Sequence, residues 1–315
     1  MHWTFCASLI IIGSTCTLVL LFTGLPQFEE NDRFSVGIFQ PPSTSCQAEL
    51  AYLTTEQTRR CLQLRLNRTG RPLKIVIAGD SRMRQLYFSL LYQATGLDED
   101  WTTNHSVPDP GPAPTNPNRG LAAQRENQKI IPKHNDRSKI LPEIGLEAKF
   151  HWLVALTDGK LRSIVKDATS SSTDLLLVSH GLWSIWTCIK QKKSDSDCLK
   201  QYQKDLKGHI PAITALPTST SFIWVPQNAI LEPLIRRKFT DPIGKLKDRN
   251  IVAYNNAAKN VLSTTRSIFW GSHYEASRVF RDTYDGLHLG RRTKEFDAQV
   301  LFDYVCAKQG DSFRN

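Results

Sequence analysis

The feature that most constrains the fold is a short apolar run followed at once by a helical repeat. Lys74–Gly79 is a continuous apolar stretch that ends in glycine, as expected for a strand buried on both faces. Directly after it, apolar side chains recur with the spacing of one helix face, at Met83, Leu86, Tyr87, Leu90 and Leu91. Strand, tight turn and helix in this order form the opening unit of a doubly wound α/β sheet.

The same alternation continues along the chain. Further apolar runs predict strands at 149–155, 174–178, 221–225 and 267–270, and helical spacing predicts helices at about 247–262 and 292–305. Strands that alternate with helices form a mostly parallel sheet with helices on both faces. We therefore expect a flavodoxin-like three-layer α/β sandwich.

One long segment breaks this pattern. From about 96 to 147 no period is visible, and prolines accumulate between Pro108 and Pro142. A segment of this length without regular structure is usually a functional insertion or disordered. We predict an irregular insertion at 96–147.

The N-terminus predicts a membrane anchor. The first 26 residues contain no Lys, Arg, Asp or Glu, and 8–25 are apolar except for Ser, Thr, Gly and Cys. About 18 such residues are just enough to span a bilayer and exceed the usual apolar core of a signal peptide. We expect a short cytoplasmic terminus (1–7), a transmembrane signal anchor (8–25), a stem (26–45), a luminal domain (46–308) and a tail (309–315). The alternatives are a cleaved signal peptide, hence a secreted protein, and a buried core helix.

Two sequons support a luminal domain. Asn67-Arg-Thr and Asn104-His-Ser are both acceptors for N-glycosylation, which takes place only in the secretory pathway. Both asparagines are expected at the surface. Together with the anchor they favour a single-pass type II protein of the Golgi membrane.

Five cysteines follow the anchor without the paired spacing of a zinc or redox motif. In an oxidising compartment such cysteines form structural disulfides. The local pairs are Cys46 with Cys61 and Cys188 with Cys198, which leaves Cys306 over. No metal site, phosphate loop or dinucleotide fingerprint is visible.

The net charge of +10 lies entirely beyond the predicted anchor. A basic surface attracts acidic partners. Nucleic acid is not expected in a lumen, which leaves acidic, phosphorylated or sulfated glycans and anionic headgroups. An ordinary solvated surface explains the charge equally well.

Ser81 is the candidate nucleophile. It lies in Gly79-Asp80-Ser81-Arg82, where the first strand meets the first helix, so its hydroxyl would stand at the carboxyl edge of the sheet. Backbone N–H groups and the helix dipole stabilise developing negative charge at such a point. The G-x-S-x-G motif is absent, and Asp80 and Ser81 could instead merely cap the helix.

Asp285-Gly-Leu-His288 supplies the partners that a serine nucleophile needs. An imidazole takes the serine proton, and a carboxylate orients the imidazole and stabilises its charged form. This segment follows the last predicted strand, and loops after parallel strands converge at one edge of the sheet. Ser81, Asp285 and His288 are therefore expected to be neighbours, although an Asp-x-x-His pair alone is common by chance.

Three more positions are expected at the same edge. In Ser179-His-Gly-Leu-Trp183, which follows the 174–178 strand, the N–H of Gly181 could complete an oxyanion hole with that of Ser81. His180 could have a structural or a substrate-positioning role, and Trp183 could stack on a sugar unless it belongs to the core. Arg82 and Arg84 lie next to the nucleophile, and either guanidinium could hold a substrate carboxylate. Arg82 is expected nearer the active edge, unless it is solvated or takes part in a structural ion pair, and Arg84 could instead face solvent.

These motifs together resemble a known family. Gly79-Asp-Ser-Arg-Met-Arg-Gln-Leu86 and Tyr284-Asp-Gly-Leu-His-Leu289 are similar to the SGNH-type (GDSL hydrolase-like) luminal domain of the N-acetylneuraminate 9-O-acetyltransferases. Weaker similarity occurs at Ser45-Cys46 with Cys61, Trp183-Ser-Ile185, Trp224-Val-Pro-Gln227 and Ala253-Tyr-Asn-Asn-Ala257. The likeness extends from about Pro41 to Cys306.

The resemblance implies a glycan O-acetyltransferase that acts on sialic acid through an acetyl-serine intermediate. Ser81 would be the nucleophile, His288 the base and Asp285 its orienting group. The co-substrate would be an acetyl donor such as acetyl-CoA, with no bound cofactor, and a multi-spanning membrane partner would supply acyl groups. The SGNH asparagine has no obvious counterpart in 179–183. Alternatives are a carbohydrate O-acetylesterase and a non-catalytic glycan-binding or scaffold protein.

Overall fold

The computed structural model describes residues 11–12, 15–16, 53–97, 135–239 and 243–307. The chain divides into two units, Met1–Tyr52 and Leu53–Asn315. In the first unit, β1 (Ile11–Ile12) pairs antiparallel with β2 (Thr15–Cys16). The rest of the predicted anchor at 8–25, the stem and the tail lie outside the described residues and stay predictions. Within the part of the chain that is described, no helix has the length and apolar character needed to cross a bilayer.

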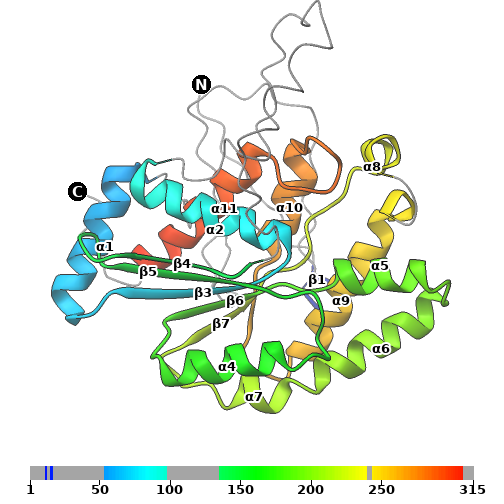
Figure 1. The fold of residues 1–315 in the computed structure, drawn as a ribbon, viewed down its shortest axis with the longest axis horizontal. Helices are drawn as coiled ribbons and strands as arrows, with labels where there is room; N and C mark the ends of the chain where they lie inside the picture. Colours follow the sequence, from blue (N-terminus) through cyan, green and yellow to red (C-terminus); the bar gives the residue numbers. More distant parts are fainter. Residues whose placement is uncertain (1–10, 13–14, 17–52, 98–134, 240–242, 308–315) are drawn as a thin grey trace, which may run out of the picture. The chain divides into compact units, whose positions relative to one another are not determined.

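The second unit alternates strands and helices, as Figure 1 shows. Its strands are β3 (Leu73–Gly79), β4 (Arg137–Leu141), β5 (Leu146–Trp152), β6 (Leu175–Val178), β7 (Ser221–Trp224) and β8 (Ile268–Phe269). Its helices are α1 (Thr55–Thr69), α2 (Ser81–Thr95), α4 (Lys160–Ser170), α5 (Leu182–Lys190), α6 (Asp195–Lys207), α7 (Ile210–Thr214), α8 (Glu232–Lys238), η1 (Ile243–Lys245), α9 (Asp248–Leu262), α10 (Gly271–Phe280) and α11 (Arg291–Ala307).

The strands form one sheet in the order β4-β5-β3-β6-β7-β8. All neighbours pair parallel except β4, which runs antiparallel to β5 at one edge. Helices α1, α2 and α11 cover one face of the sheet, and α4, α7 and α9 lie on the other (Figure 1). The predicted mostly parallel, three-layer α/β fold is confirmed.

The central strand explains why the chain folds this way. In β3 every residue except Lys74 is buried, and Val76 and Ala78 belong to the core that also includes apolar side chains of α4 and α9. The residues predicted to form the inner face of α2 are all buried. Continuous apolar character in the strand and a one-sided face in the helix thus produce a sheet with helices on both sides.

The predicted insertion is wrong at its C-terminal end. Residues 98–134 lie outside the description, but β4 and the first residues of β5 fall inside the predicted range of 96–147. The sequence pattern does not predict β4, because this edge strand leaves Ser138 and Ile140 exposed and has charged residues at Arg137 and Lys139. Edge strands with charged side chains lack a buried apolar pattern. A tight turn that ends at Gly145, with φ of +70°, joins the two strands.

The cysteine pairing is partly wrong. Cys188–Cys198 forms as predicted. Cys61, however, pairs with Cys306 and not with Cys46, so the cysteine predicted to be left over is bonded. Sequence proximity suggested Cys46, whereas the fold packs α1 against α11 and brings Cys61 and Cys306 together across 245 residues. Cys46 lies outside the described residues.

The first sequon is accessible. Asn67 is exposed in the last turn of α1, as expected for a glycosylation acceptor. Asn104 lies in the part of the chain that the structure leaves undescribed. Glycosylation at both positions stays a prediction.

Candidate active site

Ser81 lies where the strand order of the sheet reverses. The chain runs from β3 to β4 and β5 on one side and then returns to β6 on the other. In open α/β sheets, ligands bind outside the carboxyl ends of the strands at this kind of switch point. The loop that follows β6, residues 179–181, adjoins the same point.

The turn from β3 to α2 presents the serine hydroxyl. Asp80 caps α2, and its Oδ1 accepts a hydrogen bond from the N–H of Arg82 at 2.9 Å. Gly79 is required for close packing, because a Cβ there would lie 2.3 Å from Cγ of Met83. Ser81 is the first residue of the helix and is half-buried. Helix capping explains Asp80, but it does not explain the partner that Ser81 finds.

That partner is His288. Ser81 Oγ lies 2.9 Å from Nε2 of His288, and Nδ1 of the same ring lies 2.7 Å from Oδ2 of Asp285. With Asp285 accepting the Nδ1 proton, Nε2 is left to accept the hydroxyl proton of Ser81. Asp285 and His288 follow Ser81 by 204 and 207 residues in the sequence, and the structure joins all three side chains in one chain of hydrogen bonds.

The loop between α10 and α11 holds the two partners in place. Oδ1 of Asp285 accepts hydrogen bonds from the backbone N–H groups of Leu287 at 2.9 Å and His288 at 2.8 Å. Gly286 has φ of +87°, and a Cβ there would lie 2.5 Å from the carbonyl oxygen of Leu231. The spacing of three residues is thus that of a tight turn whose acid binds both the ring and the backbone of the histidine.

Electrostatics keep this acid charged. Burial opposes ionisation of Asp285, but the hydrogen bond and charge of His288 and the two backbone N–H groups prevail and lower its pKa to about 2. Tyr284 stacks on the His288 ring with centroids 5.9 Å apart and 10° between planes. Burial and the charge of Asp285 raise the pKa of Tyr284 far above neutrality. A neutral phenol and an ionised carboxylate therefore flank the imidazole.

The substrate role suggested for Arg82 is wrong. Its side chain is only 3% exposed and pairs with Asp80, with Nη2 2.8 Å from Oδ2 and Nε 3.3 Å from Oδ1. Nη2 also donates to Oε1 of Gln227. Burial opposes ionisation of Asp80, yet the charge of Arg82 holds the pKa of that carboxyl below its usual range. Arg82 has the alternative role, a structural ion pair beneath the nucleophile.

Replacing Arg82 by Met is expected to lower the free energy of unfolding by about 3 kcal/mol, because the Asp80 carboxylate would stay buried without its counter-charge. Urea denaturation measures the change. Arg249→Met, at an exposed position of α9, is the matched control and should stay within about 0.5 kcal/mol of the wild type. Unchanged stability of Arg82→Met together with a selective loss of activity on acidic substrates would return Arg82 to substrate binding.

His180 does not face a substrate either. It is buried, its Nε2 lies 3.0 Å from the carbonyl oxygen of Val154, and its ring stacks on Tyr202 with centroids 6.0 Å apart. Burial lowers the pKa of His180 and keeps the ring neutral, so Nε2 donates its proton to that carbonyl. Of the two roles considered, the geometry fits the structural one, and substrate positioning by this side chain is wrong.

Gly181 and Trp183 do lie at the carboxyl end of β6. Gly181 has φ of +153°, a backbone angle that strains any larger residue, and a Cβ there would lie 3.0 Å from Cγ of Gln227. Trp183 is half-buried in the first turn of α5, edge-on to Trp186 with centroids 5.2 Å apart. An oxyanion-hole role for the N–H groups of Ser81 and Gly181 and a stacking role for Trp183 stay predictions.

The sequence predicted no role for Gln227, although this residue belongs to one of the segments that resemble the family, Trp224-Val-Pro-Gln227. This buried side chain accepts from Arg82 and from the N–H of Leu182 at 3.1 Å, and donates to Oγ of Ser179 at 2.6 Å. Asn255 fixes its backbone, accepting from the N–H at 2.7 Å and donating to the carbonyl oxygen at 2.9 Å. Gln227 thus joins the loops after β3, β6 and β7, a role that only the topology reveals.

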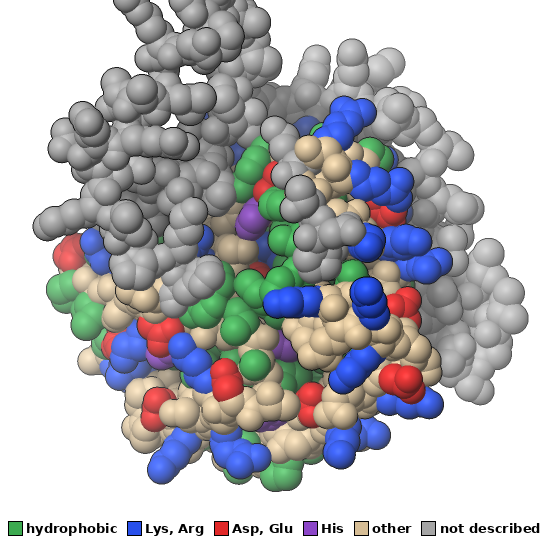
Figure 2. All heavy atoms as spheres, turned by 45° about the vertical axis from the view of Figure 1, so that its right-hand side comes forward, with side chains coloured by type: hydrophobic (Ala, Val, Ile, Leu, Met, Phe, Trp, Pro, Cys, Tyr) green, Lys and Arg blue, Asp and Glu red, His purple; other side chains and the backbone are tan. Residues whose placement is uncertain are grey.

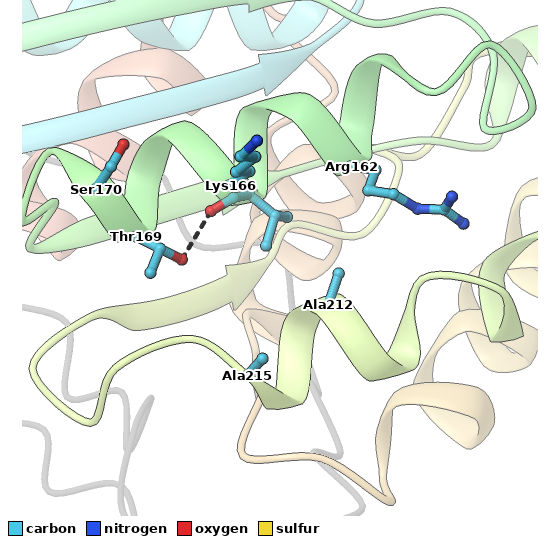
Figure 3. A pocket seen from close by; sticks show the side chains of 7 residues that line it. Arg162, Lys166, Thr169, Ser170, Ala212 and Ala215 are labelled. Carbon is cyan, nitrogen blue, oxygen red and sulfur yellow. Dashed lines mark hydrogen bonds between the residues drawn. The ribbon is translucent and has the colours of Figure 1, made fainter.

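Among the described residues, no group of three or more His, Cys, Asp and Glu side chains could hold a metal ion. An open groove of about 360 Å³ lies between α4 and α7 (Figure 3), lined by Arg162, Val165, Lys166, Thr169, Ser170, Ala212 and Ala215. It contains none of the predicted site residues.

In Figure 2, Lys and Arg side chains are spread over the face drawn, with acidic side chains among them, so charge alone does not mark a site.

Comparison with known proteins bears on this geometry. The chain is 23% identical, over 243 residues, to the N-acetylneuraminate (7)9-O-acetyltransferase of Danio rerio, and the match covers 76% of the chain. The chain therefore resembles a sialate O-acetyltransferase over about three quarters of its length. The resemblance inferred from the sequence is therefore confirmed, and it agrees with the prediction of an acyl-transferring or hydrolytic enzyme. The match spans only 26% of the relative's own length.

Solved structures resemble the chain only loosely. An acetylxylan esterase from Geobacillus stearothermophilus has a TM-score of 0.36 and 15% identity, covering 53% of this chain and 75% of its own. An α/β hydrolase from the metagenome of Lake Arreo, Spain, has a TM-score of 0.43 and 12% identity, covering 76% and 98%. No protein-family profile matches the chain.

Proposed function

We propose that this protein is a glycan O-acetyltransferase that acts on acceptors of the sialic acid type through an acetyl-serine intermediate. The observation that carries the proposal is the relay of Ser81, His288 and Asp285 at the switch point of the sheet. A serine within 2.9 Å of an imidazole that a carboxylate orients is the arrangement required for nucleophilic acyl transfer.

In the first half-reaction, Nε2 of His288 takes the hydroxyl proton as Ser81 Oγ attacks the carbonyl carbon of the acetyl donor. The N–H groups of Ser81 and Gly181, with the N-terminus of α2 behind them, would stabilise the oxyanion that forms. The oxyanion collapses, the bond to the donor's leaving group breaks, and His288 returns its proton to that group. Acetyl-Ser81 remains.

In the second half-reaction, a sugar hydroxyl replaces the leaving group. His288 takes the hydroxyl proton, the sugar oxygen attacks the acetyl-Ser81 carbonyl, and Ser81 leaves with the proton from His288. Asp285 stays ionised throughout, because its pKa of about 2 lies far below neutrality. Water in place of the sugar hydroxyl would make the same site a carbohydrate O-acetylesterase, which is the second candidate function.

The test offers the purified full-length chain acetyl-CoA with a sialylated glycan, and separately an O-acetylated sialoglycan in water. We expect acetyl transfer to the glycan and, on rapid quenching, one acetyl group on the peptide that contains Ser81, both measured by mass spectrometry. Release of acetate from the second substrate without transfer to the first would support the esterase. Binding of the glycan with neither reaction, and no labelling of Ser81 by a fluorophosphonate, would contradict both enzymes and favour a binding protein.

A further inference from the structure

The residue three positions after the nucleophile lies on the same side of α2. Residues three apart on a helix are neighbours on its surface, so Ser81 and Arg84 share a face. Arg84 is half-buried, and its guanidinium carbon lies 5.6 Å from the ring centroid of Trp152. An arginine over an indole is held by the attraction of its charge to the ring face.

Trp152 places this guanidinium at the active edge of the sheet. It is the last residue of β5 and pairs with Gly79, the last residue of β3, two positions before Ser81. The indole is only 9% exposed, so it serves as a support for Arg84 and not as an open surface for a sugar. Its backbone N–H is fixed by Oδ1 of Asp136 at 2.8 Å.

Arg84 also lies close to the triad. Its positive charge acts on the phenol of Tyr284, the ring that stacks on His288. Tyr284 thus has His288 stacked on its ring and the charge of Arg84 within electrostatic reach, and Arg84 itself lies over Trp152. An anionic group bound at Arg84 would lie about one helical turn from Ser81, where it could orient a substrate.

A second cation lies on the same sheet face. Arg137 opens β4 and pairs with Phe150, so the alternation of β5 puts it on the face of Phe150 and Trp152. Nε of Arg137 is buried and has no hydrogen-bond partner among the described residues. The neighbouring acid, Asp136, is already held by His151 Nδ1 and Lys160 Nζ, both at 2.9 Å. Arg137 thus adds positive charge that Asp136 does not neutralise.

We propose that Arg84, held over Trp152 and assisted by the charge of Arg137, binds the carboxylate of an acidic sugar and selects acidic over neutral glycans. The inference rests on the proposed function for the identity of the sugar. Of the two arginines next to the nucleophile, Arg82 is paired with Asp80, and Arg84 is the one assigned to the substrate. A planar guanidinium binds a carboxylate through two parallel N–H bonds, which an ammonium cannot reproduce.

The test measures equilibrium binding, which does not depend on turnover. The ligands are the methyl glycoside of N-acetylneuraminic acid and its carboxyl methyl ester, titrated against the full chain by calorimetry. We expect the wild type to bind the acid about tenfold or more tightly than the ester, and Arg84→Gln to bind both equally. Arg84→Lys, which keeps the charge without the fork, should retain only part of the preference. Arg162→Gln, an exposed arginine in the groove of Figure 3, is the charge-matched control and should bind as the wild type does.

Thermal unfolding establishes that each variant is folded. If the wild type binds acid and ester alike, or if folded Arg84→Gln keeps the preference, the inference is overturned. Should Arg84→Gln fail to fold, the same comparison with Arg84→Lys and Arg137→Gln decides it, since a full preference in both variants would contradict the proposal. A clear preference in a wild type that shows neither transfer nor hydrolysis would instead overturn the proposed function and leave the carboxylate site standing.

Discussion

Ser81→Ala and His288→Ala are each expected to lower kcat/KM for acetyl transfer, or for hydrolysis, by about 10³-fold or more. The first change removes the oxygen that would carry the acetyl group, and the second removes the base 2.9 Å from it. Because both act in one step, the double variant should lose little beyond either single variant. Asp285→Asn should be somewhat milder, since Ser81 and His288 remain but the ring loses its orienting charge.

Initial rates with an acetylated sialoglycan and with a neutral aryl acetate measure the loss, and both substrates should lose activity in parallel. Ser163→Ala, at an exposed position of α4, serves as the control for a serine outside the relay. Residual activity of Ser81→Ala close to that of the wild type would exclude a serine nucleophile. Multiplied losses in the double variant would show that the two residues act in separate steps.

The fold could be predicted where buried periodicity is strong. The structure places β3 within one residue of the predicted strand and buries every residue of the helix face predicted in α2. The strand predicted at 149–155 instead spans 146–152, because the apolar run continues past Trp152 to Leu153, which is buried in the loop beyond the strand end. β4 was missed because an edge strand buries too little to leave a pattern. The local sequence therefore indicates which residues are buried. It indicates where a strand begins and ends only as far as burial follows the strand.

The approach of Ser81, Asp285 and His288 could be predicted because topology brings their loops together, whereas the contacts of the two arginines depend on side-chain packing. Arg82 and Arg84 lie one and three residues after Ser81, and the direction of each side chain around the helix decides which partners it reaches. Arg82 turns back to the capping carboxylate of Asp80 and the amide of Gln227, while Arg84 turns toward Trp152. Neither Gln227 nor Trp152 is close to the helix in sequence. No local pattern could have assigned these partners.

The disulfide that the sequence missed should stabilise the fold more than the one it found. Cys61–Cys306 ties α1 to α11 across 245 residues, whereas Cys188–Cys198 closes a loop of only 10. In the chain-entropy description, a cross-link restricts the unfolded state more as the closed loop lengthens. The expected contributions are about 5 kcal/mol for the long loop and about 3 kcal/mol for the short one.

Replacing both Cys61 and Cys306 by Ser should therefore lower the free energy of unfolding by about 5 kcal/mol, measured by urea denaturation of the oxidised protein. The matched control replaces both Cys188 and Cys198 by Ser, which makes the same chemical change in a short loop. Cys61 is 1% exposed and Cys306 is 5% exposed, so a second pair of variants with Ala separates the loss of the cross-link from the burial of new hydroxyl groups. A smaller loss for the long-loop pair than for the short-loop pair, in both Ser and Ala forms, would contradict the pairing of Cys61 with Cys306.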